Sequence, residues 1–262
     1  MILPVADPDD PRIVGFLAVR ERDLIGRQGL FVAEGEVVLR LVASRPGHRL
    51  RALLLSESGA RRLEDLLPGL DVPIYVASQE VMDAVVGFHI HRGILGLVEP
   101  PPAPEPEALL AGLPERAMVV GLMGISNHDN MGGIFRNAAA FGAAAVLLAG
   151  ACCDPFYRKA IRVSVGASLI VPFTRVAGGA DMVRLFEGAG FEVVSLSPAG
   201  ATALSAYVPP ARTAAIFGTE GPGLPADILA ATRTVSIPMA AGFDSLNVAT
   251  TSGIVLHHLA RG

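Results

Sequence analysis

Residues 245–260 restrict the fold of this chain more than any other stretch, because they are helical in periodicity and contain no Asp, Glu, Lys or Arg. The spacing of three and four residues that predicts a helix is kept by Leu246, Ala249, Gly253, Leu256 and Ala260. A helix without a solvated face is buried in a core, a membrane or a subunit interface. The run is shorter than about 18 apolar residues and contains polar side chains, so a membrane span is not expected.

The residues before this helix form a predicted loop that opens at Pro238 and contains Gly242. Asp244 and Ser245 are the expected N-caps of the helix, because their side chains accept hydrogen bonds from its first N–H groups. Ser245 and Asn247 are then polar residues near a buried helix start and need partners. Taken alone, the stretch leaves open whether these residues only cap the helix or also serve a ligand.

A proline-rich segment divides the chain into two predicted domains. Residues 99–107 read EPPPAPEPE, a composition that favours an extended, semi-rigid spacer. The length of 262 residues accommodates two domains of about 100 to 200 residues each. We therefore expect a small domain at 1–99, a linker at 100–116 and a second domain at 117–262.

Both domains are predicted to be α/β. In the first, strands are expected at 29–35, 49–55, 72–77 and 93–99, and helices at 11–23, 36–44, 57–67 and 78–86 with Ser78 as an N-cap. In the second, strands are expected at 117–123, 144–149, 168–174, 191–197, 213–218 and 234–238. Helices between several of these strands predict a mostly parallel sheet covered on both faces.

The charge and the N-terminal sequence limit the partners and the compartment. A net charge of -4 argues against nucleic-acid binding through a broad basic surface, although a local patch stays open. No apolar run reaches transmembrane length, and MILPVADPDDPR has acids where a signal peptide has basic residues. We expect a cytoplasmic protein that does not associate with membranes.

Neither the cysteines nor the histidines predict a metal site. Cys152 and Cys153 are adjacent, which suits neither a structural disulfide nor a zinc pattern, so two reduced and buried thiols are expected. His89 and His91 alternate as on a surface strand, without a third ligand nearby. No metal is therefore expected.

The first stretch that carries chemistry is GLMGISNHDNMGGIFRNAAAFG, at 121–142. A buried strand ends at Met123, and a helix is expected to begin near Met131 with Asn130 as its N-cap. Arg136 then falls near the edge of the sheet at which open α/β proteins bind ligands. Read alone, Arg136 fits a surface helix position better than a functional one. The G-x-G-x-x-G fingerprint is absent after this strand, which argues against a nicotinamide cofactor.

The second stretch is IFGTEGPGLP, at 216–225, where a strand breaks into a loop containing Gly218, Gly221 and Gly223. Glycines at this density let the backbone turn sharply or approach a ligand. Glu220 is a lone carboxylate in a loop without basic residues, so the loop is no phosphate cradle of the lysine-containing kind. A plain turn is the simpler interpretation of this stretch alone.

Together, three motifs in this order resemble the SpoU (TrmH) family of RNA ribose 2'-O-methyltransferases, which belongs to the knotted class of S-adenosylmethionine-dependent enzymes. They are N-x-x-N-x-G-x-I-x-R-x-A-x-x-F-G, G-x-E-G-x-G-L and I-P-M-x-x-x-x-[DE]-S-L-N-V, and they cover about residues 117–260. The segment RQGLFVAEGEVVLRLV also resembles the start of the small L30e-like RNA-binding domain that often precedes the catalytic domain in this family.

The resemblance implies a deep trefoil knot in the C-terminal domain, an exception to the rule that protein chains are unknotted. It implies an S-adenosylmethionine pocket formed by the knotted loops and a homodimer formed through the knotted domain. The cofactor-binding residues by position are Phe217, Gly218, Gly223, Ile237, Met239 and Leu246. Two departures from the family pattern lie near this pocket: Ala249, where a serine is frequent, and His128, where a proline is frequent.

The resemblance also implies a catalytic set, whose members are Arg136, Asn130, Glu220, Ser245 and Asn247. Arginine is almost never deprotonated in proteins, so Arg136 is expected to hold a phosphate and stabilise alkoxide charge. Asn130 would orient Arg136 or the ribose, Glu220 would anchor an arginine or the loop, and Ser245 and Asn247 would fix the turn and the nucleotide.

The expected substrate is a ribose 2'-hydroxyl in tRNA or rRNA, with RNA bound mainly by the first domain. The better candidates for backbone contacts are Arg22, Arg27, Arg49 and Arg51. A non-catalytic RNA-binding or assembly factor with the same fold is the alternative, and the complete set of motif residues argues against it.

Overall fold

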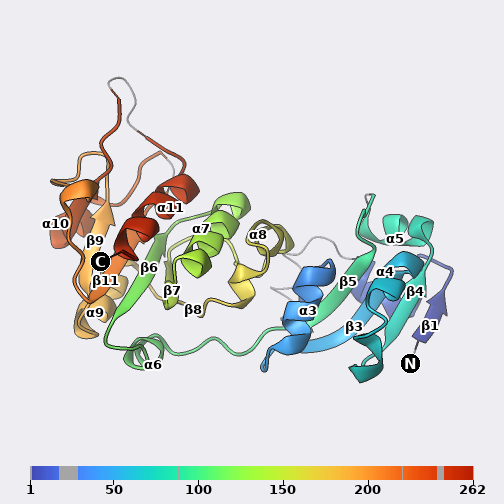
Figure 1. Cartoon of the computed structure of the whole chain (residues 1–262). Helices are drawn as coiled ribbons and strands as arrows, with labels where there is room; N and C mark the ends of the chain where they lie inside the picture. The colour runs from blue at the N-terminus through green and yellow to red at the C-terminus, as the bar shows by residue number, and fades with distance from the viewer. Residues whose placement is uncertain (1, 18–28, 88, 220, 241–244, 262) are drawn as a thin grey trace. The chain divides into compact units, whose positions relative to one another are not determined.

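The structure is a computed structural model that describes residues 2–17, 29–87, 89–219, 221–240 and 245–261. It divides into two compact units (Figure 1). The N-terminal unit comprises Met1–Pro102 and Phe156–Leu169, and the C-terminal unit comprises Ala103–Pro155 and Ile170–Gly262. Among the described residues, no helix has the length and apolar character needed to cross a bilayer.

The N-terminal unit contains a five-stranded mixed sheet in the order β1-β4-β3-β5-β2. Its strands are β1 (Ile2–Val5), β2 (Phe31–Glu34), β3 (Arg49–Ser56), β4 (Ile74–Ala77) and β5 (Ile94–Glu99). Its first helices are α1 (Val14–Leu17), α3 (Glu36–Ser44), α4 (Glu57–Arg62) and α5 (Gln79–Val86). The four expected strands are all present, and β1 is an additional strand that pairs with β4.

Alternation along β3 builds a core on both faces of this sheet. Leu53 and Leu55 belong to one apolar cluster and Leu54 to another, and all three are fully buried. Successive side chains of a strand point to opposite faces, so one leucine-rich strand serves both clusters. Ser78 caps α5 as predicted, accepting the N–H of Val81 at 3.3 Å.

Three local expectations in this part of the chain need revision. α4 ends at Arg62 instead of residue 67, and the described part of the first helix consists of a 3-10 turn at Pro11–Ile13 followed by α1. His89 and His91 lie in the loop before β5, not on a strand, and their rings meet edge to face at 4.6 Å. In the part of the chain that the structure describes, no cluster of three His, Cys, Asp or Glu side chains is arranged to hold a metal ion.

The C-terminal unit contains a seven-stranded sheet in the order β10-β12-β9-β11-β6-β7-β8, in which each ladder is parallel. The strands are β6 (Ala117–Met123), β7 (Ala145–Ala149), β8 (Phe173–Arg175), β9 (Glu192–Leu196), β10 (Thr202–Ala203), β11 (Arg212–Phe217) and β12 (Arg233–Ser236). The prediction of an α/β fold with a mostly parallel sheet is confirmed. The trefoil knot and the L30e-like character of the N-terminal unit stay predictions.

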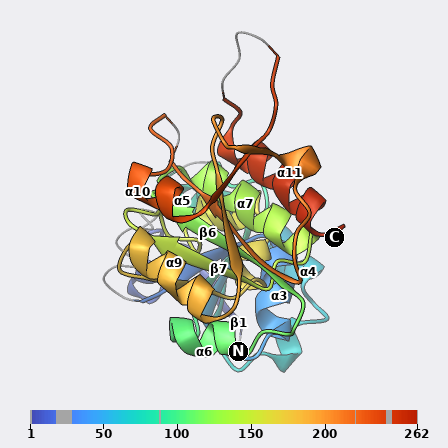
Figure 2. The same ribbon diagram turned by 90° about the vertical axis from the view of Figure 1, so that its left-hand side faces the viewer.

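Helices cover both faces of the parallel sheet. They are α6 (Pro106–Ala111), α7 (His128–Ala140), α9 (Gly179–Gly188), α10 (Ala226–Ala231) and α11 (Val248–Leu259). Figure 2 shows α9 on one side of β6 and β7, with α7 and α11 together on the other. A parallel sheet needs this double cover because both of its faces are apolar.

The chain between 99 and 117 is not a spacer throughout, because α6 begins at Pro106. Proline is favourable in the first turn of a helix, where its missing N–H has no intrahelical partner to lose. The expected strand at 168–174 is also shorter, since Ala167–Leu169 forms a 3-10 turn and β8 begins only after Pro172.

The segment 156–169, expected within the second domain, clusters with the N-terminal unit and contains α8 (Arg158–Val163). Phe156 stacks on Phe31 of β2 with 5.0 Å between the ring centroids. Arg158 forms an ion pair with Glu34, which is only 7% exposed. A buried carboxylate needs such a cationic partner, and the partner comes from a segment more than 120 residues away in sequence.

Candidate functional site

The loop between β6 and α7 brings the first motif to the carboxyl edge of the parallel sheet. α7 begins at His128 with Asn127 as its N-cap, not near Met131 with Asn130 as predicted. Oδ1 of Asn127 accepts the N–H groups of Asp129 at 2.7 Å and of Asn130 at 3.3 Å. Asn130 therefore lies in the first turn of the helix, where its side chain is buried.

The third motif has the same arrangement. α11 begins at Val248, and its N-cap is Asn247, whose Oδ1 accepts the N–H groups of Ala249 at 2.9 Å and Thr250 at 3.2 Å. The predicted caps were Asp244, which lies outside the described residues, and Ser245, which is exposed. Asn247 adopts the extended backbone that an N-cap requires, two residues nearer the apolar run.

These corrected helix starts place two predicted catalytic residues in contact. Nδ2 of Asn247 donates a hydrogen bond of 2.8 Å to Oδ1 of Asn130. The direction of this bond follows from the cap: Oδ1 of Asn247 already accepts two backbone N–H groups, so its Nδ2 faces Asn130. The first and third motifs are thereby joined at the N-terminal ends of α7 and α11.

Arg136 projects from α7 and is exposed. It forms no hydrogen bond or ion pair with any residue in the described ranges, so no carboxylate there neutralises its guanidinium. Its neighbours Phe135 and Ala138 are fully buried and hold this part of the helix on the sheet. A cation on a rigid helix without an internal partner is suited to an anionic ligand.

The second and third motifs meet in a cavity of about 150 Å³ at the carboxyl ends of β9, β11 and β12. All six residues predicted to bind the cofactor line it, together with the predicted catalytic Ser245. The full lining is Leu196, Ser197, Pro198, Phe217, Gly218, Thr219, Gly221, Gly223, Val235, Ile237, Met239, Ser245, Leu246, Val248 and Thr251. Segments distant in sequence thus converge at the edge where open α/β sheets bind ligands.

The glycine-rich loop of this cavity is closed on itself. A Cβ atom added to Gly218 would lie 2.6 Å from the carbonyl carbon of Gly223 and from the nitrogen of Leu224. Gly223 donates its N–H to the carbonyl of Thr219 at 3.2 Å, and it has a left-handed φ of 71°. Only glycine allows the two sides of the loop to approach this closely.

Several lining residues were missed by sequence reasoning. Leu196, Ser197 and Pro198 follow β9, and Thr251 lies in the first turn of α11. In the sequence, Leu196–Pro198 can be recognised only as the end of a predicted strand. That this strand, β9, lies beside β11 is known only once the strand order is known.

The other predicted site residues are not brought together here. Glu220, Arg22 and Arg27 lie outside the described residues. Arg49 and Arg51 belong to β3 of the N-terminal unit and are exposed. Arg51 forms an ion pair with Glu99 on the neighbouring strand, whereas Arg49 has no ion pair within the described part of the chain.

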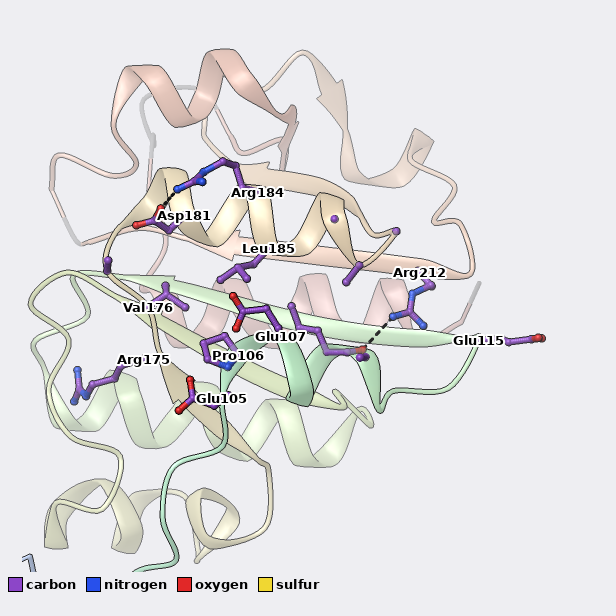
Figure 3. Close-up of a pocket in the computed structure, with 16 residues that line it drawn as sticks. Glu105, Pro106, Glu107, Glu115, Arg175, Val176, Asp181, Arg184, Leu185 and Arg212 are labelled. Atoms are coloured by element: carbon purple, nitrogen blue, oxygen red, sulfur yellow. Dashed lines mark hydrogen bonds and ion pairs between the residues drawn. The ribbon is translucent and has the colours of Figure 1, made fainter.

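A larger hollow of about 1300 Å³ lies elsewhere in the C-terminal unit, between α6 and α9. Figure 3 shows Pro106 and Glu107 on one side of it and Asp181 and Arg184, which form an ion pair, on the other. None of the motif residues lines this hollow. Size alone therefore does not identify the functional site, and convergence of the three motifs favours the smaller cavity.

An all-parallel α/β unit with convergent loops at the carboxyl edge of its sheet belongs to the broad class of open α/β proteins that bind ligands there. The model of the SpoU rRNA Methylase family matches residues 117–257. The chain belongs to this family, as the motifs predicted.

Two relatives support the assignment. An uncharacterized tRNA/rRNA methyltransferase of Mycobacterium bovis is 38% identical over 267 residues, covering 98% of this chain and 91% of the relative. A protein with the same description from Mycobacterium marinum is 31% identical over 79% of this chain and 66% of its own length.

Solved structures share the fold along nearly the whole chain. The AdoMet-bound rRNA methyltransferase of Sinorhizobium meliloti has a TM-score of 0.84 at 23% identity, covering 99% of this chain and 98% of that one. The SpoU methyltransferase AviRb of Streptomyces viridochromogenes, in complex with AdoMet, has a TM-score of 0.82 at 24% identity, covering 96% and 97%.

Proposed function

We propose that this chain transfers the methyl group of S-adenosylmethionine to a ribose 2'-hydroxyl of tRNA or rRNA. The observation that carries the proposal is the convergence of all six predicted cofactor residues on one cavity at the carboxyl edge of the parallel sheet. Membership of the SpoU family supports the reaction class. A neighbour described as an RNA 2'-O ribose methyltransferase, with a TM-score of 0.80 at 24% identity, agrees with the ribose assignment.

The cavity has the chemical character that a nucleoside-containing cofactor needs. Ile237, Leu246 and Val248 provide apolar contacts suited to a flat purine, and the glycine-rich loop exposes backbone groups at close range. Bound S-adenosylmethionine supplies the electrophilic methyl group. The protein must then hold the ribose hydroxyl in line with it and favour loss of the hydroxyl proton.

Arg136 is proposed to act through its charge. Its exposed guanidinium would bind the phosphate beside the target ribose and stabilise the alkoxide that develops as the methyl group is transferred. Asn130 and Asn247 would keep the start of α7 against the start of α11. Ser245, which lines the cavity, and Asn247 are proposed to fix the turn and the nucleotide. Glu220 is proposed to anchor an arginine or the loop.

RNA binding is proposed to involve the N-terminal unit. Arg49 is the better described candidate for a phosphate contact, because Arg51 must first release Glu99. A homodimer through the C-terminal unit is also proposed. The exposed side of α11 presents Thr250, Ile254 and His257 and contains no Asp, Glu, Lys or Arg. Such a surface suits a protein partner.

The test combines cofactor binding with methyl transfer. S-adenosylmethionine, but not NAD, should raise the melting temperature of the wild-type protein, and tritiated methyl groups should appear in total tRNA or rRNA. Nuclease mapping then locates the label, which must lie on a ribose. Arg136→Ala should reduce transfer to a small residual rate while cofactor binding persists. Undiminished transfer by this variant would overturn the role of Arg136, and RNA binding without any transfer by the wild type would favour the non-catalytic alternative.

A further inference from the structure

Asn137 is not among the predicted site residues. Its side-chain amide links α7 to α11. Its Nδ2 donates to the carbonyl oxygen of Ala249 at 2.7 Å and to Oγ of Ser252 at 2.9 Å. Ser252 is fully buried, and its hydroxyl donates to the same carbonyl at 2.8 Å. Three polar groups thus satisfy one another inside a helix pair, where an unpaired amide would be costly.

Small residues on both helices make this bond possible. A Cβ atom added to Gly133 would lie 2.7 Å from Cβ of Ala249, and one added to Gly253 would lie 3.2 Å from Nδ2 of Asn137. The helix backbones therefore approach closely, and the amide sits in the space that Gly253 leaves. A hydrogen bond tolerates only a few tenths of an ångström of stretch, so the amide fixes how far one helix is shifted along the other.

The two helices carry different parts of the candidate site. α11 contributes Val248 and Thr251 to the cavity wall, while α7 carries Arg136, which directly precedes Asn137. A shift of α7 along α11 would move the guanidinium relative to anything bound in the cavity. The Asn130 to Asn247 bond holds the first turns together, and Asn137 adds a second fixed point two helical turns further along α7.

We propose that Asn137 is a positioning residue for methyl transfer, which sets the place of the Arg136 guanidinium relative to the cofactor cavity. This inference rests on the proposed function. Its chemical basis is that transfer requires the reacting groups in near-attack geometry, and a misplacement of about 1 Å can lower the rate by about 100-fold. Cofactor affinity depends on the cavity wall, which Asn137 does not line.

The test measures methyl transfer and cofactor affinity separately for Asn137→Ala and Asn137→Asp, with the RNA that accepts label from the wild type. Both variants lose the donor to Ala249. We expect kcat to fall by about 10- to 100-fold, because a misplacement of about 1 Å between reacting groups lowers the rate by up to about 100-fold. The Kd for S-adenosylmethionine, measured by calorimetry, should change by less than about twofold. Equal losses in kcat and affinity, or no loss in kcat, would overturn the proposal.

A double-mutant cycle distinguishes positioning of Arg136 from a general loss of structure. If Asn137 acts through Arg136, adding Asn137→Ala to Arg136→Ala should leave the residual rate unchanged. Independent, multiplying effects would refute the inference. Val255→Ala is the matched control, because Val255 is buried in α11 and outside the amide link. It should lower the melting temperature and leave kcat near the wild-type value at 25 °C.

The wild-type measurements separate this inference from the proposed function. A wild-type protein that binds no cofactor and labels no RNA contradicts the proposed function and the positioning role with it. A wild-type protein that does both, combined with an unaffected Asn137→Asp variant, contradicts the positioning role alone. If Asn137→Ala proves too unstable to assay, Asn137→Asp decides the question, since it preserves the shape of the side chain.

Discussion

Asn247 and Asn130 are 117 residues apart in sequence, and Nδ2 of the first donates a 2.8 Å hydrogen bond to Oδ1 of the second. The same Asn247 side chain caps α11 through Oδ1. The amide of Asn247 therefore both caps α11 and binds Asn130. Substitution by alanine removes both interactions, whereas substitution by aspartate removes only the bond to Asn130.

Asn247→Ala should destabilise the protein by about 1 to 3 kcal/mol, the combined effect of a lost N-cap and a lost hydrogen bond. Asn247→Asp keeps an oxygen for the cap and places a favourable negative charge at the helix N-terminus, but it loses the donor to Asn130. We expect the aspartate variant to be the more stable of the two in urea unfolding. The reverse order would show that repulsion between the new carboxylate and Oδ1 of Asn130 costs more stability than the cap contributes.

Gly133→Ala should be destabilising by about 1 to 3 kcal/mol, because the new methyl group overlaps Cβ of Ala249 at 2.7 Å. The Ala249→Gly substitution in the same chain should restore part of the loss. Gly188→Ala serves as the control, since nothing lies within 4 Å of its Cβ position at the end of α9. Thermal unfolding of the four proteins checks the prediction, and a Gly133→Ala protein as stable as the control would contradict it.

Gly218→Ala should weaken S-adenosylmethionine binding by more than tenfold. Its methyl group would meet backbone atoms of Gly223 and Leu224 at 2.6 Å, and a backbone cannot rotate away as a side chain does. The loop must open, and the cavity wall changes with it. Calorimetric titration measures the affinity, and circular dichroism shows whether the rest of the fold persists. Wild-type affinity in a folded variant would exclude this loop from the cofactor site.

Cys153 should react slowly with iodoacetamide at pH 8. Burial, followed by the neighbouring Cys152 and Asp154, raises the pKa of Cys153 to about 12, so the reactive thiolate is scarce in the folded protein. The unfolded thiol ionises near its ordinary pKa of 9, so this group favours folding below pH 9 and stops doing so as the pH rises toward 12. Mass spectrometry of alkylated peptides, with and without urea, measures the difference. Both thiols were expected to be buried, but only Cys152 is, and Cys153 is half-buried. Equal rates in both states would contradict the raised pKa of Cys153.

RNA binding should depend only weakly on salt, and Arg49 should contribute more than Arg51. Removing one phosphate contact lowers the slope of log K against log salt by about 1, which we expect for Arg49→Ala. Arg51→Ala should have a smaller effect because Arg51 already pairs with Glu99. Filter binding at several salt concentrations provides the slopes. A steep wild-type slope, or equal effects of the two variants, would contradict this assignment.

Much of the fold could be read from the sequence because its periodicities are local. The apolar runs at 117–123 and 144–149 became β6 and β7 within one residue. The uncharged run at 245–260 contains α11, which buries one side and leaves Thr250, Ile254 and His257 exposed, so the absence of charge did not mean a helix buried all round within this chain. Glycines 218 and 223 were recognised as part of a loop in which the backbone can turn sharply or approach a ligand, since that freedom belongs to the residue itself. The close approach of Gly218 to Gly223 appears only in the structure. The three motifs likewise sufficed to predict the family.

What only the tertiary structure decided depends on contacts between distant segments. The N-cap of α7 is Asn127 and not Asn130, and the N-cap of α11 is Asn247 and not Ser245. Burial of Asn130 against α11 and its hydrogen bond with Asn247 outweigh the local capping preference. Arg158 packs with the N-terminal unit, because the carboxylate of Glu34 is buried there and needs a cationic partner. Arg51 of β3 forms an ion pair with Glu99 of the neighbouring strand β5. A local pattern specifies the conformation of a segment, whereas partners for buried or charged groups are chosen by the folded chain as a whole.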